Sequence, residues 1–286
     1  WAALPSLRCQ LADVRDERRL EEGFRGCDGV VHAAALKRIT QSVYSPGELV
    51  ATNVLGTINV IRAATEVGVS KVVFVSSDKC TEATNLYGMT KAVAECYSVQ
   101  SNSYSWPRGT RVAAVRYGNV LLSRGSVIHV WRDQIARSVP LTITDPAMTR
   151  FSILLREAVE MVLWAIEHSL GGEIFVPKIA SFRITDLAEA IGPGCRRQIV
   201  GIRPGEKLHE EMITESDSLA TIDLGRYFAI LPANGRLTFE RYCQHMPAKR
   251  VPAGFAYHSG RNSEFLTVQQ IRSLISEHVD PGFTPR

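Results

Sequence analysis

The chain has 286 residues, of which 45% are apolar and 22% charged, and its formal net charge at pH 7 is +4. This composition is typical of a globular protein, and the length allows one large domain or two smaller ones. Because the basic residues are scattered, the modest positive charge favours an anionic small-molecule substrate and argues against a nucleic-acid partner.

The sequence also argues against a membrane protein and against a metal site. It has no run of about 18 apolar residues and no signal peptide, so no membrane partner is expected. Its six cysteines have no C-x-x-C spacing and no accompanying histidine pattern, which argues against zinc and against a disulfide framework. We therefore expect reduced thiols, a cytoplasmic location and no bound metal.

The first predicted strand covers residues 6–12, where apolar and polar side chains alternate. Asp13 follows it, at a place where nucleotide-binding sheets often carry an acidic residue that bonds the nucleoside part of a cofactor. Alternatively, Asp13 or Asp16 caps a helix that begins at Arg15. No glycine-rich phosphate-binding turn precedes Asp13, so we expect a chain that is truncated at its N-terminus.

Residues 29–35 predict a second strand, which is buried and ends in three alanines. Small side chains there would allow a flat ligand to lie close to the backbone. Residues 48–66 predict an amphipathic helix, which Gly68 ends.

The segment 71–91 carries most of the chemistry. Residues 72–75 predict a buried strand, and the four polar residues 76–79 follow at its carboxyl end. In an open α/β sheet, ligands bind outside the carboxyl ends of the strands. A helix is then predicted from about residue 86 to about residue 103.

Tyr87 and Lys91 are four residues apart and therefore share one face of this helix. A free phenol titrates near pH 10, and a nearby ammonium lowers that pKa because it favours the phenolate. Such a tyrosine can take a proton from a sugar hydroxyl while hydride leaves the same carbon. The alternative is an ordinary solvated helix face.

Further elements are predicted downstream. A strand over 111–116 leads to polar residues that include Asn119, and a substrate domain would begin with residues 123–131. Trp131 either stacks on a nucleotide base or, as we favour, belongs to the core. A helix over 153–168, a strand over 173–177, a helix capped by Ser181 or Thr185, and a terminal helix capped by Thr267 complete the chain.

Two arginines are candidates for phosphate binding. Arg150 either contacts a diphosphate or forms a buried structural ion pair. Arg203 suits a pyrophosphate, because a guanidinium offers a fork of donors to phosphate oxygens. Glu206 would hold a ribose hydroxyl or Arg203 itself.

Taken together, these motifs resemble the extended short-chain dehydrogenase/reductase family and, within it, the UDP-N-acetylglucosamine 4,6-dehydratases. They follow the family's order over nearly the whole chain: LADVRD (11–16), VVHAAALK (30–37), TNVLGTINVI (52–61), SSDK (76–79), YGMTK (87–91), VRYGNVLLSRGSV (115–127), ITDPAMTRF (143–151) and GIRPGEKLHE (201–210). The resemblance implies an α/β fold with a Rossmann-like doubly wound parallel sheet. This sheet would lack its first βαβ phosphate-loop portion and be joined by a smaller α/β substrate domain. The expected boundaries are 1–122 for the cofactor domain, with 150–180 returning to it, and 123–286 for the substrate domain.

The resemblance also implies NAD or NADP as cofactor, a UDP-sugar substrate and a homo-oligomer. The residues that match cofactor-binding positions are Asp13, Val14, Ala33, Ala34, Ala35, Lys37, Tyr87 and Lys91. Those that match substrate-binding positions are Lys37, Ser77, Asn119, Val127, Thr144, Arg150, Arg203 and Glu206. Asn53 is expected to brace the backbone of the site.

The implied reaction dehydrates UDP-N-acetylglucosamine to a UDP-4-keto-6-deoxy-hexosamine for surface polysaccharide or glycan synthesis. Tyr87, assisted by Lys91, removes the proton of the C4 hydroxyl, whose oxygen Ser77 bonds. Lys79 is the base at C5 and Asp78 the acid at the C6 hydroxyl, and a lysine base implies inversion at C5. Asp78 and Lys79 could instead form only a salt-bridged turn.

Two other functions stay open at this point. A sugar-nucleotide 4-epimerase would use Tyr87 and Lys91 but would need no acid–base pair at 78–79. A non-catalytic fragment or interaction module would need neither, and the missing phosphate-binding turn supports it.

Overall fold

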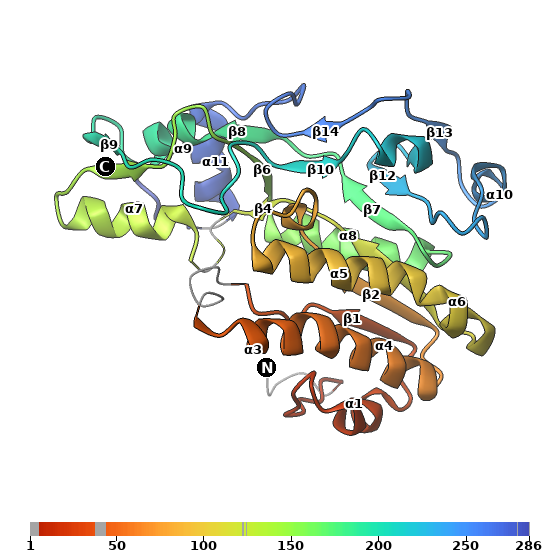
Figure 1. Ribbon diagram of the computed structural model, residues 1–286. Helices are drawn as coiled ribbons and strands as arrows, with labels where there is room; N and C mark the ends of the chain where they lie inside the picture. Colours follow the sequence, from red (N-terminus) through yellow and green to blue (C-terminus); the bar gives the residue numbers. More distant parts are fainter. Residues whose placement is uncertain (1–5, 38–43, 122, 124, 279, 286) are drawn as a thin grey trace.

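The computed structural model describes residues 6–37, 44–121, 123, 125–278 and 280–285. Its largest element is a seven-stranded sheet with the order β1-β2-β3-β7-β12-β11-β13, seen in Figure 1. Strands β1, β2, β3 and β7 are parallel, and the remaining three pair antiparallel. Their bounds are Gly29–His32 (β1), Lys71–Val75 (β2), Arg111–Val115 (β3), Ile174–Pro177 (β7), Tyr227–Ile230 (β12), Thr221–Asp223 (β11) and Lys249–Arg250 (β13).

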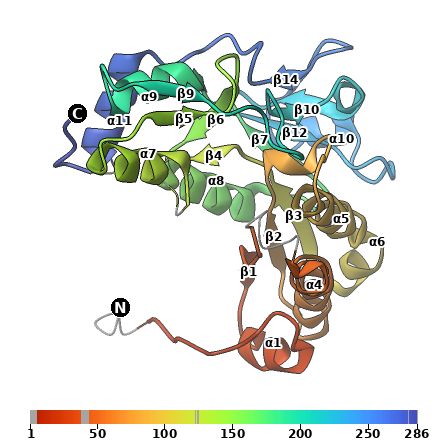
Figure 2. The same ribbon diagram turned by 60° about the vertical axis from the view of Figure 1, so that its left-hand side comes forward.

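Helices cover both faces of this sheet, as Figure 2 shows around β2 and β3. Val73 and its register partner Ala113 pack against α8 (Leu155–His168) on one face. The alternate residues of the same strands pack on the other face, against α4 (Gly56–Glu66) and α5 (Leu86–Gln100). Since both faces are buried, these strands are continuous apolar runs, as parallel strands usually are. The expected doubly wound α/β fold is confirmed.

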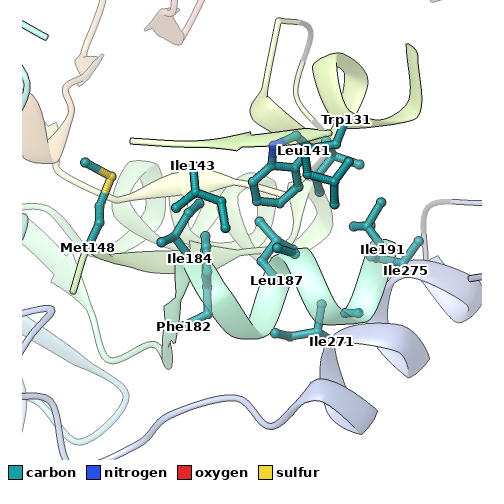
Figure 3. Packing of buried hydrophobic residues seen from close by; sticks show 13 residues of the cluster. Trp131, Leu141, Ile143, Met148, Phe182, Ile184, Leu187, Ile191, Ile271 and Ile275 are labelled. Atoms are coloured by element: carbon teal, nitrogen blue, oxygen red, sulfur yellow. The ribbon is translucent and has the colours of Figure 1, made fainter. Parts of the chain in front are cut away.

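A second group of elements surrounds a separate core. It comprises β4 (Asn119–Val120), α7 (Val127–Ala136), β5 (Leu141–Ile143), β6 (Thr149–Ile153), β8 (Ser181–Arg183), α9 (Ile184–Ile191), β9 (Arg197–Ile199) and α11 (Val268–His278). Strands β10 (Glu211–Ile213) and β14 (Tyr257–His258) pair with each other and pack against β7 and β12 of the large sheet. Figure 3 shows the packed side chains of the second group, with Trp131 beside Leu141 and Leu187. Trp131 is fully buried, and its Nε1 donates to the carbonyl of Thr142 at 2.8 Å. Trp131 is therefore a core residue, and base stacking is excluded.

The remaining helical elements are short. They are α1 (Glu17–Phe24), α3 (Pro46–Val50), α6 (Asn102–Ser105), α10 (Phe239–Cys243), the π-helical turn Ala51–Leu55 and the 3₁₀ turns Asp78–Cys80, Trp106–Arg108 and Asp217–Ala220. No helix in the described part of the chain combines the length and the apolar character that crossing a bilayer requires.

The large sheet draws on several parts of the sequence. Strand β7 lies in the segment 150–180 that we expected to return to it. Residues 221–250 also join it, through β11, β12 and β13, although we had assigned them to the substrate domain. The domain boundary at residue 122, which is itself outside the described residues, stays a proposal.

Several local predictions need correction. Residues 6–12 form no strand and are exposed, because an alternating pattern makes a strand only where a neighbour offers hydrogen bonds. The predicted strand over 29–35 ends at His32, so the three alanines follow it as irregular backbone. The predicted helix over 48–66 is interrupted by the π-helical turn.

The helix caps were predicted with mixed success. Asp16, not Asp13, caps α1, by accepting from the backbone N–H of Arg19. Thr267 accepts from the backbone N–H of Gln270 at 3.3 Å, as predicted for the terminal helix. The cap of α9 was predicted wrongly: Ser181 lies in β8, Thr185 lies inside the helix, and the N-cap position shows no side-chain hydrogen bond.

Trp131→Ala tests the core of the second group. Removing a fully buried indole leaves a cavity, so the free energy of unfolding should fall by about 3–5 kcal/mol. The matched control is Val130→Ala, because the neighbouring Val130 is 48% exposed and should matter far less. Urea unfolding followed by circular dichroism measures both, and equal losses would contradict the assignment of Trp131 to the core.

Candidate active site

The site is built where β2 and β3 end. The backbone N–H of Ser76 donates to the carbonyl of Val115 at 2.7 Å, and that of Asp78 donates to the carbonyl of Tyr117 at 3.1 Å. Ser77 is extended and caps the 3₁₀ turn Asp78–Cys80 by accepting from the backbone N–H of Lys79. The polar residues after β2 are thus held against the backbone that follows β3.

Helix α5 packs directly on this turn. Asn85 caps the helix by accepting from the backbone N–H of Gly88 at 2.9 Å. A Cβ at Gly88 would lie only 2.3 Å from the carbonyl oxygen of Lys79, so glycine is required here. This close approach places Tyr87 beside the turn that carries Ser77, Asp78 and Lys79.

Asp78 and Lys79 form a hydrogen-bonded ion pair. Asp78 is fully buried, and its Oδ1 accepts from Lys79 Nζ at 2.8 Å and from Ser77 Oγ at 3.0 Å. Asp78 Oδ2 has no hydrogen-bond partner among the described residues. Burial disfavours the Lys79 ammonium, but the attraction of Asp78 and Glu210 outweighs it and raises the pKa of Lys79 above its ordinary value.

Glu210 is a site residue that the sequence reasoning missed. Its side chain is buried, and its Oε1 lies 3.5 Å from Lys79 Nζ and 3.6 Å from Arg150 Nε. Its Oε2 lies 3.5 Å from Lys207 Nζ. The sequence offered one signal, an acidic residue after the basic segment 203–207, but no local pattern shows that this side chain points inward.

Tyr87 and Lys91 lie on α5 as expected, yet their electrostatics differ from the expectation. Burial and the Asp78 carboxylate raise the pKa of Tyr87, whereas the Lys79 ammonium and a hydrogen bond with Ser77 lower it. Burial is the largest of these effects, and the net shift is upward. Lys91 is not among these causes. Lys79 is the ammonium that acts most strongly on the phenol here, and the role of Lys91 in lowering the pKa of Tyr87 stays a prediction.

Lys91 is buried and directed toward the sheet. Its Nζ donates to the carbonyl of Val75 at 2.6 Å and lies 4.0 Å from the centroid of the Phe74 ring. Burial lowers its pKa to about 8. Lys91 also helps to keep His32 neutral, because burial and this nearby cation lower the pKa of His32 to about 4.

Asn53 braces the site, as expected. Its side chain accepts from the backbone N–H of Leu36 at 2.8 Å and donates to the carbonyl of Leu36 at 2.9 Å. It also donates to Thr90 Oγ1 at 3.1 Å. The π-helical turn that contains Asn53 thus joins the segment after β1 to α5, a placement common for such turns at functional sites.

The expected cofactor residues fall into two groups. Ala33, Ala34 and Lys37 are exposed and Ala35 is half-buried, all directly after β1. The three alanines have small side chains and lie next to the segment that Asn53 holds against α5. They fit a flat nicotinamide ring near Tyr87 and Lys91.

The two residues expected at the adenine end of the cofactor, Asp13 and Val14, already contact other residues of the chain. Asp13 is bound by Arg15 at 2.7 Å, and this partner lowers the pKa of Asp13 to about 2. Val14 packs against α4, where a Cβ at Gly56 would lie 2.6 Å from its Cγ2. A cofactor would share Asp13 with Arg15. Within the described ranges, no cluster of three His, Cys, Asp or Glu side chains could hold a metal ion.

Of the expected substrate residues, Arg203 and Glu206 lie beside α5. Thr84 Oγ1 and Asn85 Nδ2 each donate to the carbonyl of Gly205 at 2.9 Å, which fixes this loop next to the start of the helix. Arg203 is 69% exposed, with its Nη1 3.6 Å from Glu206 Oε1, so its guanidinium is accessible to a phosphate.

Arg150 has a different environment. Its Nη atoms donate to the backbone carbonyls of Thr149, Lys207 and Leu208, and its Nε faces Glu210. This arrangement matches the buried ion pair that we had kept as the alternative to a diphosphate contact.

Three further expected substrate residues lie in the second group of elements or at its edge. Asn119 is exposed on β4, Val127 is the half-buried first residue of α7, and Thr144 is half-buried just after β5. Their roles remain predictions.

Lys91→Met tests the environment of the buried lysine. The pKa of Lys91 falls from 10.5 to about 8 on folding, so between these pH values the unfolded chain binds the extra proton. The contribution of Lys91 to the free energy of unfolding should therefore rise with pH above about 8, by about 3 kcal/mol in all, and level off near 10.5.

Urea unfolding of both chains between pH 7 and pH 10.5 measures this effect. Lys91→Met should lack the rise, so the free-energy difference between the two chains should change with pH. A difference that stays constant would show that Lys91 keeps an ordinary pKa.

Comparison with known proteins places the chain in a family. A family model described as "Polysaccharide biosynthesis protein" matches residues 3–232. The chain is 40% identical over 275 residues to a UDP-N-acetylglucosamine 4,6-dehydratase (inverting) of Campylobacter jejuni, covering 94% of this chain and 82% of that one. It is 36% identical over 276 residues to a UDP-glucose 4-epimerase of Rickettsia akari, covering 95% and 80%.

Solved structures agree with these sequence matches. The X-ray structure of Pen from Bacillus thuringiensis is similar, with a TM-score of 0.84 at 34% identity, covering 94% of this chain and 82% of that chain. Two structures with bound NAD, DesIV from Streptomyces venezuelae and MoeE5, have the same fold at 22% and 21% identity, with TM-scores of 0.65 and 0.61. The chain belongs to the polysaccharide biosynthesis protein family, within the extended short-chain dehydrogenase/reductases.

Proposed function

We propose that the chain dehydrates UDP-N-acetylglucosamine to a UDP-4-keto-6-deoxy-hexosamine, with inversion at C5, for the synthesis of surface polysaccharide or glycan sugars. The observation that carries this proposal is the Asp78–Lys79 pair, 2.8 Å apart beside Tyr87 at the carboxyl end of β2. An acid and a base side by side are what an elimination requires. The Campylobacter relative, 40% identical, bears the name of this activity.

Tyr87 acts on the C4 hydroxyl. It takes the hydroxyl proton, and the Lys79 ammonium and the hydrogen bond with Ser77 favour the phenolate that this step needs. When bound, NAD or NADP would supply the hydride acceptor for C4 and the hydride donor for C6. Ala33, Ala34, Ala35, Lys37 and Lys91 would hold the cofactor at this edge of the sheet, with Asp13 and Val14 at its adenine end.

Lys79 and Asp78 then carry out the elimination. The 4-ketone makes the C5 proton acidic, and Lys79 Nζ removes it. The electrons of the C5–H bond form a C5=C6 double bond while the C6–O bond breaks, and Asp78 gives the leaving hydroxyl a proton, so that water departs.

In the free site, the proton that Asp78 needs for this step is on Lys79. The raised pKa of Lys79 keeps it an ammonium in the free site, where it is paired with Asp78 at 2.8 Å. Transfer of one proton along the 2.8 Å hydrogen bond converts the pair into a neutral amine and a carboxylic acid. That single transfer prepares both groups and leaves the charge of the site unchanged.

On the substrate side, we propose that Arg203 binds the diphosphate and that Glu206 holds a ribose hydroxyl or Arg203. Asn119, Val127 and Thr144 would contact the sugar nucleotide from the second group of elements. A 4-epimerase is the second candidate, because the Rickettsia relative carries that name at 36% identity. Epimerisation requires no acid–base pair at C5 and C6, so the geometry of Asp78 and Lys79 favours dehydration.

We further propose a cytoplasmic enzyme that self-associates. Cys9, Cys27, Cys80, Cys96 and Cys243 are free thiols, which fits a reducing compartment. Met89 and Val93 leave an apolar stripe about half exposed on α5, which fits contact with a second copy. Sedimentation velocity of the purified chain measures its mass in solution and would contradict self-association if only monomer were found.

Proton NMR of the chain with UDP-N-acetylglucosamine and NAD in heavy water tests the function. The expected product is a 4-keto-6-deoxy sugar with deuterium at C5, whose ring couplings report inversion. Lys79→Ala should lower its formation by a factor of about 10²–10⁴, because a positioned base is lost. Lys249→Ala, an exposed lysine of β13, is the control and should act like the wild type.

The other outcomes are distinct. A C4 epimer formed without loss of water would support the epimerase, and no turnover at all would support a non-catalytic protein. Undiminished dehydration by a folded Lys79→Ala would remove Lys79 from the mechanism.

A further inference from the structure

We propose that Glu210 is a positioning residue for the elimination, holding the Lys79 amine in place while its proton passes to Asp78. The proposal rests on the proposed function and deepens it. Neither the motifs nor the expected reaction assigned this carboxylate a role.

The backbone of Glu210 is fixed from both sides. Its N–H donates to Ser259 Oγ at 2.8 Å, and the N–H of Ser259 donates to the carbonyl of Glu210 at 2.7 Å. Ser259 is fully buried, and its Oγ lies 2.8 Å from Thr149 Oγ1. The carboxylate of Glu210 therefore extends from a rigid point toward Lys79.

The charge of Glu210 is compensated without Lys79. Arg150 Nε lies 3.6 Å from its Oε1 and Lys207 Nζ lies 3.5 Å from its Oε2. Lys207 is itself held by a hydrogen bond to the carbonyl of Thr81. A buried carboxylate with no cation would be costly, but here two cations stay in place when Lys79 becomes neutral.

This arrangement matters once the proton has moved. In the resting state, both Asp78 Oδ1 and Glu210 Oε1 attract the ammonium of Lys79. After the transfer, Asp78 is neutral and no longer attracts Nζ as an anion. Glu210 then provides the remaining negative acceptor for an N–H of the amine. Without it, a flexible four-carbon side chain would have only the neutral Asp78 to hold it while it removes the C5 proton.

Glu210→Gln separates this role from a merely structural one. The full chain is given NAD and UDP-N-acetylglucosamine, and the two steps are measured separately. Absorbance of the reduced cofactor in a single turnover reports C4 oxidation, and deuterium incorporation reports C5 proton removal. We expect C5 exchange to fall at least about tenfold while oxidation and KM stay within about twofold. The control is Glu211→Gln, for which the structure shows no ion pair with Lys79.

Two results would overturn the proposal. Equal losses in both steps, or a raised KM, would mean that Glu210 only maintains the fold. An unchanged rate of C5 exchange would mean that it has no role. If Glu210→Gln does not fold, Glu210→Asp keeps the charge but shortens the reach and should still slow C5 exchange selectively.

A measurement without substrate keeps this proposal distinct from the proposed function. Urea unfolding of Lys79→Met, Glu210→Gln and the double variant forms a thermodynamic cycle. Non-additive losses are expected if Glu210 holds Lys79, even if the wild-type chain gave no turnover and the proposed function failed. Additive losses would overturn the positioning role whatever the activity.

Discussion

The site depends on one buried charge arrangement: the ammonium of Lys79 lies between the carboxylates of Asp78 and Glu210. Buried charges are tolerated only when they are paired, and here Arg150 and Lys207 complete the pairing around Glu210. These groups come from parts of the chain that are far apart in sequence. The fold must bring the end of β2, the strand β6 and the segment before β10 together to bury them.

The two lysines of the site have opposite environments, and this divides their roles. Lys79 lies among carboxylates, which raise its pKa, and its hydrogen bond to Asp78 offers a path for proton transfer. Lys91, on α5, lies against the carbonyl of Val75 and the ring of Phe74, where burial lowers its pKa to about 8. The elimination that we propose uses Lys79, which is hydrogen-bonded to Asp78, while Lys91 links the helix to the end of the strand.

The sequence was a good guide wherever structure follows from local pattern. The apolar run of β2, the polar residues after it and the helix that begins at Leu86 were all predicted, because strand and helix periodicities are local. The side-chain cap by Thr267 was predicted for the same reason. The expectation that Asn53 braces the site came from the family resemblance, since its contacts to Leu36 and Thr90 span many residues.

The predictions that failed have one cause in common: a contact between residues far apart in the sequence does not change the local sequence pattern. Residues 6–12 alternate like a strand but have no strand beside them in the described structure. For Arg150 the sequence left a diphosphate contact and a buried ion pair open, because its donors meet the carbonyls of Lys207 and Leu208, almost sixty residues away. Glu210 was missed because only the folded chain shows that it meets Lys79.

The order in which the two lysines lose their protons tests this account most directly. Carbon NMR of the chain with ¹³C-labelled lysine, assigned with Lys79→Met and Lys91→Met, would follow both side chains through a pH titration. We expect Lys91 to titrate near pH 8 and Lys79 to stay charged well beyond that point. If Lys79 lost its proton before Lys91, its pairing with Asp78 and Glu210 would be contradicted, and with it the division of roles.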